Sequence, residues 1–78
     1  MTLYVSEMYD CDTMEKTLLG VFSKQALAEH AGSNYFDVME LAGITMLDWD
    51  YENGIHTYYY NHGYTLTITE VELDKEFE

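Results

Sequence analysis

The first quarter of the chain has the apolar pattern of a β-hairpin. Residues 2–9 place Leu3 and Val5 on one side of an extended chain, the period-two spacing typical of a strand. Residues 10–13 have the composition of a turn. Residues 17–22 are almost wholly apolar, which predicts a central strand that returns antiparallel to the first. We therefore expect the fold to open with a hairpin.

A helical region follows this predicted hairpin. Ser23 is a good N-cap residue, and residues 24–31 consist mainly of helix formers. Gly32 and Ser33 interrupt that pattern, and a second segment then places Leu41 on its apolar face and ends at Gly43. The pattern predicts a helix, a kink and a second helix.

The last part of the chain predicts three more strands. Residues 44–51 and 55–60 flank Asn53-Gly54, the strongest short-range signal for a tight hairpin, because both residues adopt positive φ at low cost. After a second turn, residues 64–73 form the fifth strand. The apolar phase of this strand slips near Thr69-Glu70, and a β-bulge there would restore one apolar face.

This order of elements predicts an α+β fold in which an antiparallel sheet of four to five strands packs on one helical layer. The chain contains no proline, and it has no low-complexity tract or internal repeat, so we expect residues 1–78 to form a single domain. A chain of this length buries about 60 to 65% of the surface that its unfolded form exposes. With 47% apolar and 23% charged residues, it lies outside the disordered class.

The charge of the chain limits the kinds of partner it can bind. Fifteen Asp and Glu stand against three Lys and no Arg, so the formal net charge is −12. Direct binding to DNA, RNA or an anionic membrane needs Lys and Arg to neutralise phosphates, and we exclude it. The expected partner is a basic protein surface or a cation.

The location predicted from the sequence is the cytoplasm. There is no signal-peptide pattern and no stretch of ~18 apolar residues. Cys11 is the only cysteine and has no partner for an internal disulfide, although an exposed thiol could link two copies on oxidation.

The carboxylates fall into three groups along the chain. In extended segments alternate residues project from one face at ~6.6 to 6.8 Å spacing, so two of the groups form rows. The groups are Asp10, Asp12 and Glu15 with Glu7; Asp48, Asp50 and Glu52; and Glu70, Glu72, Asp74 and Glu76 with Glu78. They are solvated strand faces that protect sheet edges, or they imitate a phosphate backbone and occupy a nucleic-acid-binding groove on another protein. A net charge of magnitude ~2 to 8 would serve solubility alone, which favours the second interpretation.

Aromatic residues gather in the same region as the second acidic group. Tyr58, Tyr59 and Tyr60 could form a stacking platform for single-stranded nucleic acid, but the basic groove of such platforms is missing from this sequence. Either alternate tyrosines pack in the core, or Tyr58, Tyr60 or Trp49 anchors a protein interface, where aromatic residues are enriched.

Tests for metal-dependent and enzymatic chemistry fail. Residues 48–54 begin like a calcium loop, but its position 6 would be Asn53 rather than glycine and its position 12 would be Tyr59 rather than glutamate. The three histidines lack the i, i+4 spacing of a helical zinc site. There is no Gly-x-Ser-x-Gly turn, no glycine-rich phosphate loop and no arginine to clamp an anionic substrate. We therefore expect no catalysis, no metal and no cofactor. A cation-binding domain is kept as the third hypothesis, after the two that are given below.

Two resemblances bear on function. The stretch Leu19-Gly20-Val21-Phe22-Ser23 with Ala26 and Ala28, together with Leu66-x-Ile68-x-Glu70-Val71-Glu72-Leu73-Asp74, resembles small uncharacterised bacterial and phage domains of strand, strand, helix, strand order. The size, the absence of arginine and the charge excess are similar in type to acidic phage-encoded inhibitors that mimic DNA to block restriction, CRISPR or repair proteins. The resemblance is one of class, and it transfers no functional residue.

The leading hypothesis is a non-enzymatic inhibitor, encoded by a phage or mobile element, that binds a host nucleic-acid-handling protein by charge mimicry. Charge would steer the association, and one or two aromatic residues would supply much of the affinity. The alternative is a structural module that forms a homo-oligomer through an apolar helix face or a strand edge, with the acidic surface serving solubility. The oligomeric state expected is a monomer or a homodimer.

Overall fold

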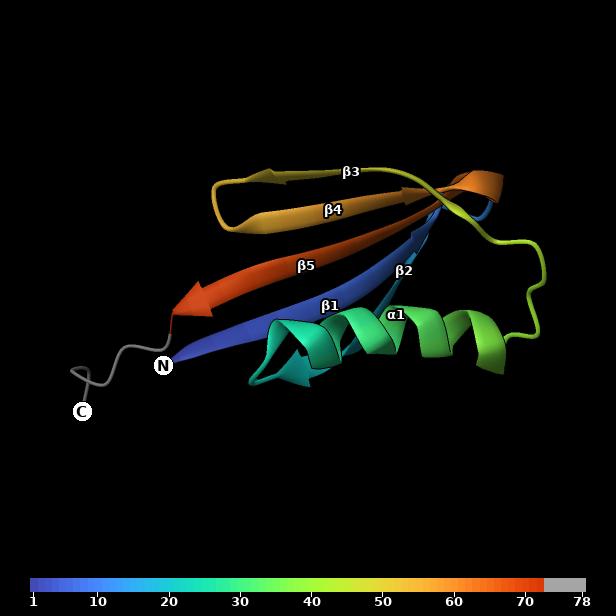
Figure 1. The fold of residues 1–78 in the computed structure, drawn as a ribbon. Helices are drawn as coiled ribbons and strands as arrows, with labels where there is room; N and C mark the ends of the chain where they lie inside the picture. Colours follow the sequence, from blue (N-terminus) through green and yellow to red (C-terminus); the bar gives the residue numbers. More distant parts are fainter. Residues whose placement is uncertain (73–78) are drawn as a thin grey trace.

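A computed structural model describes residues 1–72 of the chain as one antiparallel sheet with one helix packed on it (Figure 1). In chain order the elements are β1 (Thr2–Asp10), β2 (Glu15–Phe22), α1 (Gln25–Val38), β3 (Met46–Glu52), β4 (Ile55–Tyr60), the short 3₁₀ helix η1 (Asn61–Gly63) and β5 (Tyr64–Glu72). The predicted α+β class, with five strands and one helical layer, is confirmed.

The strands lie in the order β2-β1-β5-β4-β3. The predicted opening hairpin of β1 and β2 is confirmed. The prediction that β2 is a central strand is wrong, because β5 takes the other side of β1 and leaves β2 at the edge. The apolar run in β2 does not mean burial on both faces, since Leu18 and Val21 are exposed.

The β-bulge predicted at Thr69-Glu70 is also wrong. β5 pairs with β1 without a shift from Thr2↔Glu72 to Asp10↔Tyr64. Val71 stays on the opposite face from Ile68 and is 40% exposed. No helix covers that face within the described residues, so nothing requires Val71 to return to the core. The register shifts lie instead in the ladders of the two edge strands, between Ser6 and Glu7 in β1–β2 and between Met46 and Asp48 in β3–β4.

Helix α1 runs without a kink through Gly32, contrary to the prediction. Gly32 is buried where the helix approaches the sheet, and a Cβ there would lie 2.6 Å from Cδ2 of Leu66. The glycine therefore permits close packing and does not break the helix. The N-cap residue is Lys24 rather than Ser23, and the helix ends at Val38, so the predicted second segment up to Gly43 does not form.

The core lies between α1 and the middle of β1 and β5. Its buried apolar side chains are Met8, Ala28, Phe36, Leu66 and Ile68. The one buried polar side chain of the described residues, Ser6, donates a hydrogen bond of 3.1 Å to the carbonyl of Ala28 and so ties β1 to the helix.

The β3–β4 hairpin has the turn that the sequence predicts. Asn53 and Gly54 have φ values of 54° and 79°, the positive values that a two-residue turn of this kind requires. β3 begins at Met46, two residues later than the predicted strand. The hairpin extends along the side of the sheet farthest from β2 (Figure 1).

Candidate partner-binding surface

The sheet has two faces, and the helix covers only part of one of them. We call the face that packs against α1 the helix side and the other the open face. Helix α1 packs on β2 and β1 and touches β5 less, so the β3–β4 hairpin extends beyond it (Figure 1). Side chains on both faces of this hairpin can therefore meet a partner.

The three acidic groups do not form one continuous face. Strand pairing places Trp49 and Tyr51 of β3 on the same side of the sheet as the buried residues of β5. The carboxylates that alternate with them therefore lie on the open face; these are Asp48, Asp50 and Glu52. Glu70 and Glu72 alternate with Ile68 and lie on the helix side. A phosphate-like row that combines these groups is therefore not supported.

The first acidic group lies at another end of the sheet. The turn between β1 and β2 contacts η1, where the amide of Cys11 donates a hydrogen bond of 3.1 Å to the carbonyl of Gly63. Asp10 and Glu15 are paired across this hairpin end, beside Asp12. Asp74 and Glu76, with Glu78, lie outside the described residues.

Two carboxylates of β3 bind the free edge of their own strand. The Asp48 carboxylate accepts a hydrogen bond of 2.8 Å from the amide of Trp49, and that of Asp50 accepts one of 2.8 Å from the amide of Tyr51. In the register that the two-residue turn sets, these amides point away from β4. The two aspartates therefore cap N–H groups that would otherwise be open to another strand, and in this way they protect the edge of the sheet.

Other acidic side chains are also held within the molecule. Glu70 lies 2.6 Å from His56 on the neighbouring strand. Glu72 accepts a hydrogen bond of 2.8 Å from the Thr2 hydroxyl and one of 3.1 Å from the terminal ammonium of Met1, and these contacts lower the pKa of its carboxyl. Asp10 accepts a hydrogen bond of 3.0 Å from the amide of Asp12. Part of the acidic surface therefore makes contacts within the protein itself.

β3 is the most exposed element of the sheet, since all seven of its residues are exposed. On the helix side Trp49 and Tyr51 are 61% and 50% exposed. On the open face the same strand presents Asp48, Asp50 and Glu52. An amphipathic strand with an aromatic face and an acidic face therefore forms one edge of the sheet.

Trp49 and Tyr58 are cross-strand partners, so two of the three aromatic residues predicted from the sequence lie side by side. The Tyr58 hydroxyl donates a hydrogen bond of 2.7 Å to Glu29 of α1. Partial burial and this carboxylate raise the pKa of Tyr58 to about 12. The third residue, Tyr60, packs against Phe36 with ring centroids 5.0 Å apart and so supports the core.

Other residues that complete this surface were not predicted from the sequence. Tyr51 lies over His56, with ring centroids 4.4 Å apart. The i, i+2 relation of Trp49 and Tyr51 was visible in the sequence, but Glu29 lies in the helix, 29 residues from Tyr58, and no local pattern points to it.

The open face of the hairpin carries a shallow groove of about 360 Å³. It is lined by Asp50, Glu52, Asn53, Ile55, Thr57 and Tyr59. Asp50 and Glu52 of the acidic row contribute to this groove from β3, and the remaining strand residues that line it come from β4.

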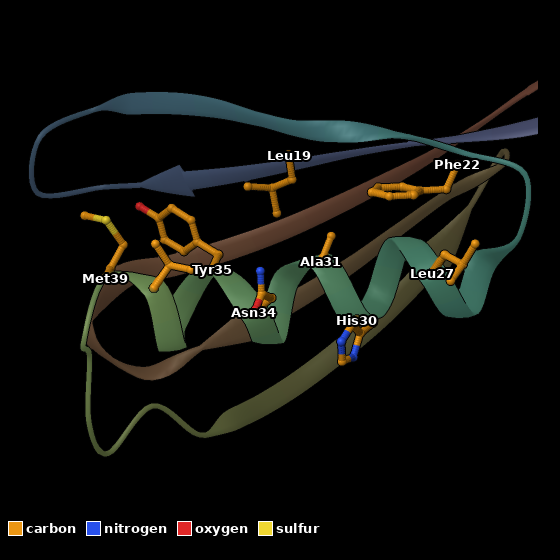
Figure 2. A pocket seen from close by; sticks show the side chains of 9 residues that line it. Leu19, Phe22, Leu27, His30, Ala31, Asn34, Tyr35 and Met39 are labelled. Carbon is orange, nitrogen blue, oxygen red and sulfur yellow. The ribbon is translucent and has the colours of Figure 1, made fainter.

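A second, apolar groove of about 440 Å³ runs between α1 and β2 (Figure 2). Leu19 and Phe22 from β2 face Leu27, Ala31 and Tyr35 from the helix across it. Its lining includes no Asp, Glu, Lys or Arg, unlike the hairpin surface. This groove fits an apolar partner surface.

Over residues 1–72, no three side chains of His, Cys, Asp or Glu are grouped so that they could bind a metal ion. In the same residues, α1 is neither long enough nor apolar enough to cross a membrane. Comparison with protein-family models, curated proteins and solved structures found no match to this chain.

Proposed function

We propose that this protein is a non-enzymatic binding protein for a basic protein surface and that the β3–β4 hairpin makes the contact. The observation that carries the proposal is that every residue of β3 is exposed, with Trp49 and Tyr51 on one face and three carboxylates on the other. Exposed aromatic residues supply contact energy, and flanking carboxylates supply electrostatic steering.

The proposed partner is a nucleic-acid-handling protein of the cytoplasm, bound by an inhibitor from a phage or mobile element. The net charge of −12 and the absence of arginine support this class of partner. The separation of the acidic groups limits the mimicry to the short row of Asp48, Asp50 and Glu52. Such a row competes for a few phosphate-binding residues and does not follow a long groove.

Affinity capture from the native host with matched charge variants tests the proposal. Asp50→Lys/Glu52→Lys changes the hairpin, and Asp12→Lys/Glu15→Lys makes the same charge change at the first hairpin. We expect the wild type and the first-hairpin variant to retain the same basic protein at low salt, and the β3 variant to release it. The captured protein should lose DNA or RNA binding when the wild type is added. Retention by the β3 variant would overturn the assigned surface, and a partner that still binds nucleic acid normally would overturn the mimicry.

The apolar groove supports a second candidate, a homo-oligomer. Leu27, Val38 and Met39 at the groove are all exposed, and an uncharged apolar groove is an unusual surface for so acidic a chain. Sedimentation over a concentration series tests this candidate. A concentration-dependent dimer that Val38→Ser weakens would support it, and a monomer at every concentration would exclude it.

A further inference from the structure

We infer that the helix side of the β3–β4 hairpin binds an extended peptide segment that carries arginine side chains at alternate positions. This inference rests on the proposed function and names the chemistry of the partner. The structural basis is a pair of adjacent aromatic–carboxylate units, built on the cross-strand pairs Trp49↔Tyr58 and Tyr51↔His56.

The first unit combines Trp49, Tyr58 and Glu29. Trp49 is exposed beside Tyr58, and the Tyr58 hydroxyl holds Oε2 of Glu29 at 2.7 Å. The same oxygen accepts a hydrogen bond of 3.1 Å from the side-chain amide of Gln25, so the carboxylate is held from two sides. Glu29 remains exposed and can accept further hydrogen bonds.

The second unit is built on the neighbouring helix-side pair of the hairpin, and it too has an exposed aromatic residue of β3, its partner on β4 and a carboxylate that this partner contacts. Tyr51 lies over His56, and His56 contacts Glu70 at 2.6 Å. The His56 side chain is 14% exposed and that of Glu70 is 30% exposed, so the carboxylate is the more accessible of the pair. An exposed aromatic residue and a carboxylate thus flank His56, as Trp49 and Glu29 flank Tyr58.

The spacing of the two units sets the form of the ligand. Trp49 and Tyr51 are two residues apart in one strand, which corresponds to ~6.8 Å. Alternate side chains of an extended peptide have this same separation and point the same way. A segment with the pattern Arg-x-Arg therefore matches both units at once, whereas two consecutive arginines project to opposite sides.

The chemistry of the units favours a guanidinium group. Its planar cation stacks on an aromatic face, and its N–H groups bind carboxylates in a fork. Glu29 and Glu70 would repel an acidic ligand. A purely apolar ligand would bury these carboxylates away from water without providing hydrogen-bond partners, which costs free energy. On the open face the hairpin has one exposed aromatic residue, Tyr59, so that face offers a single stacking position instead of two in register.

Trp49 is the only tryptophan of the chain, so its fluorescence reports directly on this surface. The intact protein is titrated with the peptide Gly-Arg-Ser-Arg-Gly and with Gly-Arg-Arg-Ser-Gly, both acetylated and amidated. We expect saturable fluorescence change with the alternating peptide and binding weaker by roughly threefold to tenfold with the consecutive one. Replacing both arginines by citrulline should abolish the signal, because the charge is lost.

Paired variants keep the net charge matched. Glu29→Gln/Glu70→Gln removes two charges on the helix side and retains oxygen acceptors for Tyr58 and His56. Asp12→Asn/Glu15→Gln removes two charges at the end of the β1–β2 hairpin, away from the β3–β4 hairpin. We expect the first variant to weaken alternating-peptide binding by roughly tenfold and the second by less than about twofold. Circular dichroism of both variants checks that they are folded.

Equal affinity for the two peptides, no saturable signal, or an equal loss in both paired variants would overturn the inference. The peptide titration requires no cellular partner and so is independent of affinity capture. If hairpin-dependent capture of a basic partner succeeds while the peptide fails, the proposed function stands and the arginine site does not.

Discussion

The hydroxyl of Tyr58 on β4 lies 2.7 Å from the carboxylate of Glu29 on α1, and this hydrogen bond joins the helix to the part of the sheet that it does not cover. Because Tyr58 pairs with Trp49, the bond also fixes the back of the proposed binding surface. The same contact thus ties the helix to the sheet and supports the proposed binding surface.

Tyr58→Phe removes this hydrogen bond and retains the ring. We expect the free energy of unfolding to fall by about 1 kcal/mol, the usual net value of one hydrogen bond. Tyr59→Phe is the matched control, since Tyr59 is exposed on the open face, and we expect a change of less than about 0.5 kcal/mol. Urea unfolding measures both. Equal losses in the two variants would show that the Glu29 contact does not contribute.

The same contact makes stability depend on alkaline pH. The pKa of Tyr58 is raised to about 12 in the folded protein, above the ordinary value of 10.0, because burial and Glu29 disfavour the phenolate. The unfolded chain therefore loses its proton first, and the stabilisation present below pH 10 declines as the pH rises toward about 12. Burial raises the pKa values of Tyr60 and Tyr64 in the same direction. Urea midpoints over this range should fall less steeply for Tyr58→Phe than for the wild type, and parallel curves would contradict the assignment.

Gly32→Ala tests the close approach of α1 to β5. Alanine has the better helix propensity by about 1 kcal/mol, but its Cβ would lie 2.6 Å from the buried side chain of Leu66. Overpacking of this kind costs about 1 to 3 kcal/mol, so we expect a net loss of stability. Ser33→Ala at the adjacent exposed position should be neutral or slightly stabilising. Combining Gly32→Ala with Leu66→Val should recover part of the loss if the clash is its cause, and additive losses would argue against it.

Asp48→Ala/Asp50→Ala uncovers the amides of Trp49 and Tyr51 at the sheet edge. Because an open edge pairs with other strands, we expect increased self-association, measured by sedimentation velocity and light scattering over a concentration series. Asp37→Ala/Glu52→Ala removes the same charge elsewhere and is the control. If both variants associate equally, loss of charge and not loss of the caps is responsible.

Local sequence determined the elements whose information is contained in neighbouring residues. The Asn53-Gly54 turn, the alternation in β1 and the opening hairpin were all predictable, because backbone preference and side-chain period act over a few residues. The net charge and the absence of arginine also follow directly from the sequence.

Tertiary structure decided what local pattern left open. Glycine has a low helix propensity, yet Gly32 lies inside α1. Leu66, which is distant in sequence, occupies the space that a side chain at this position would need, so the packing of the helix on the sheet requires glycine here. Likewise, Asp48 and Glu70 belong to similar acidic rows, yet strand pairing places them on opposite faces. Which face a helix covers depends on packing across the whole sheet, and that packing alone brings Glu29 to Tyr58.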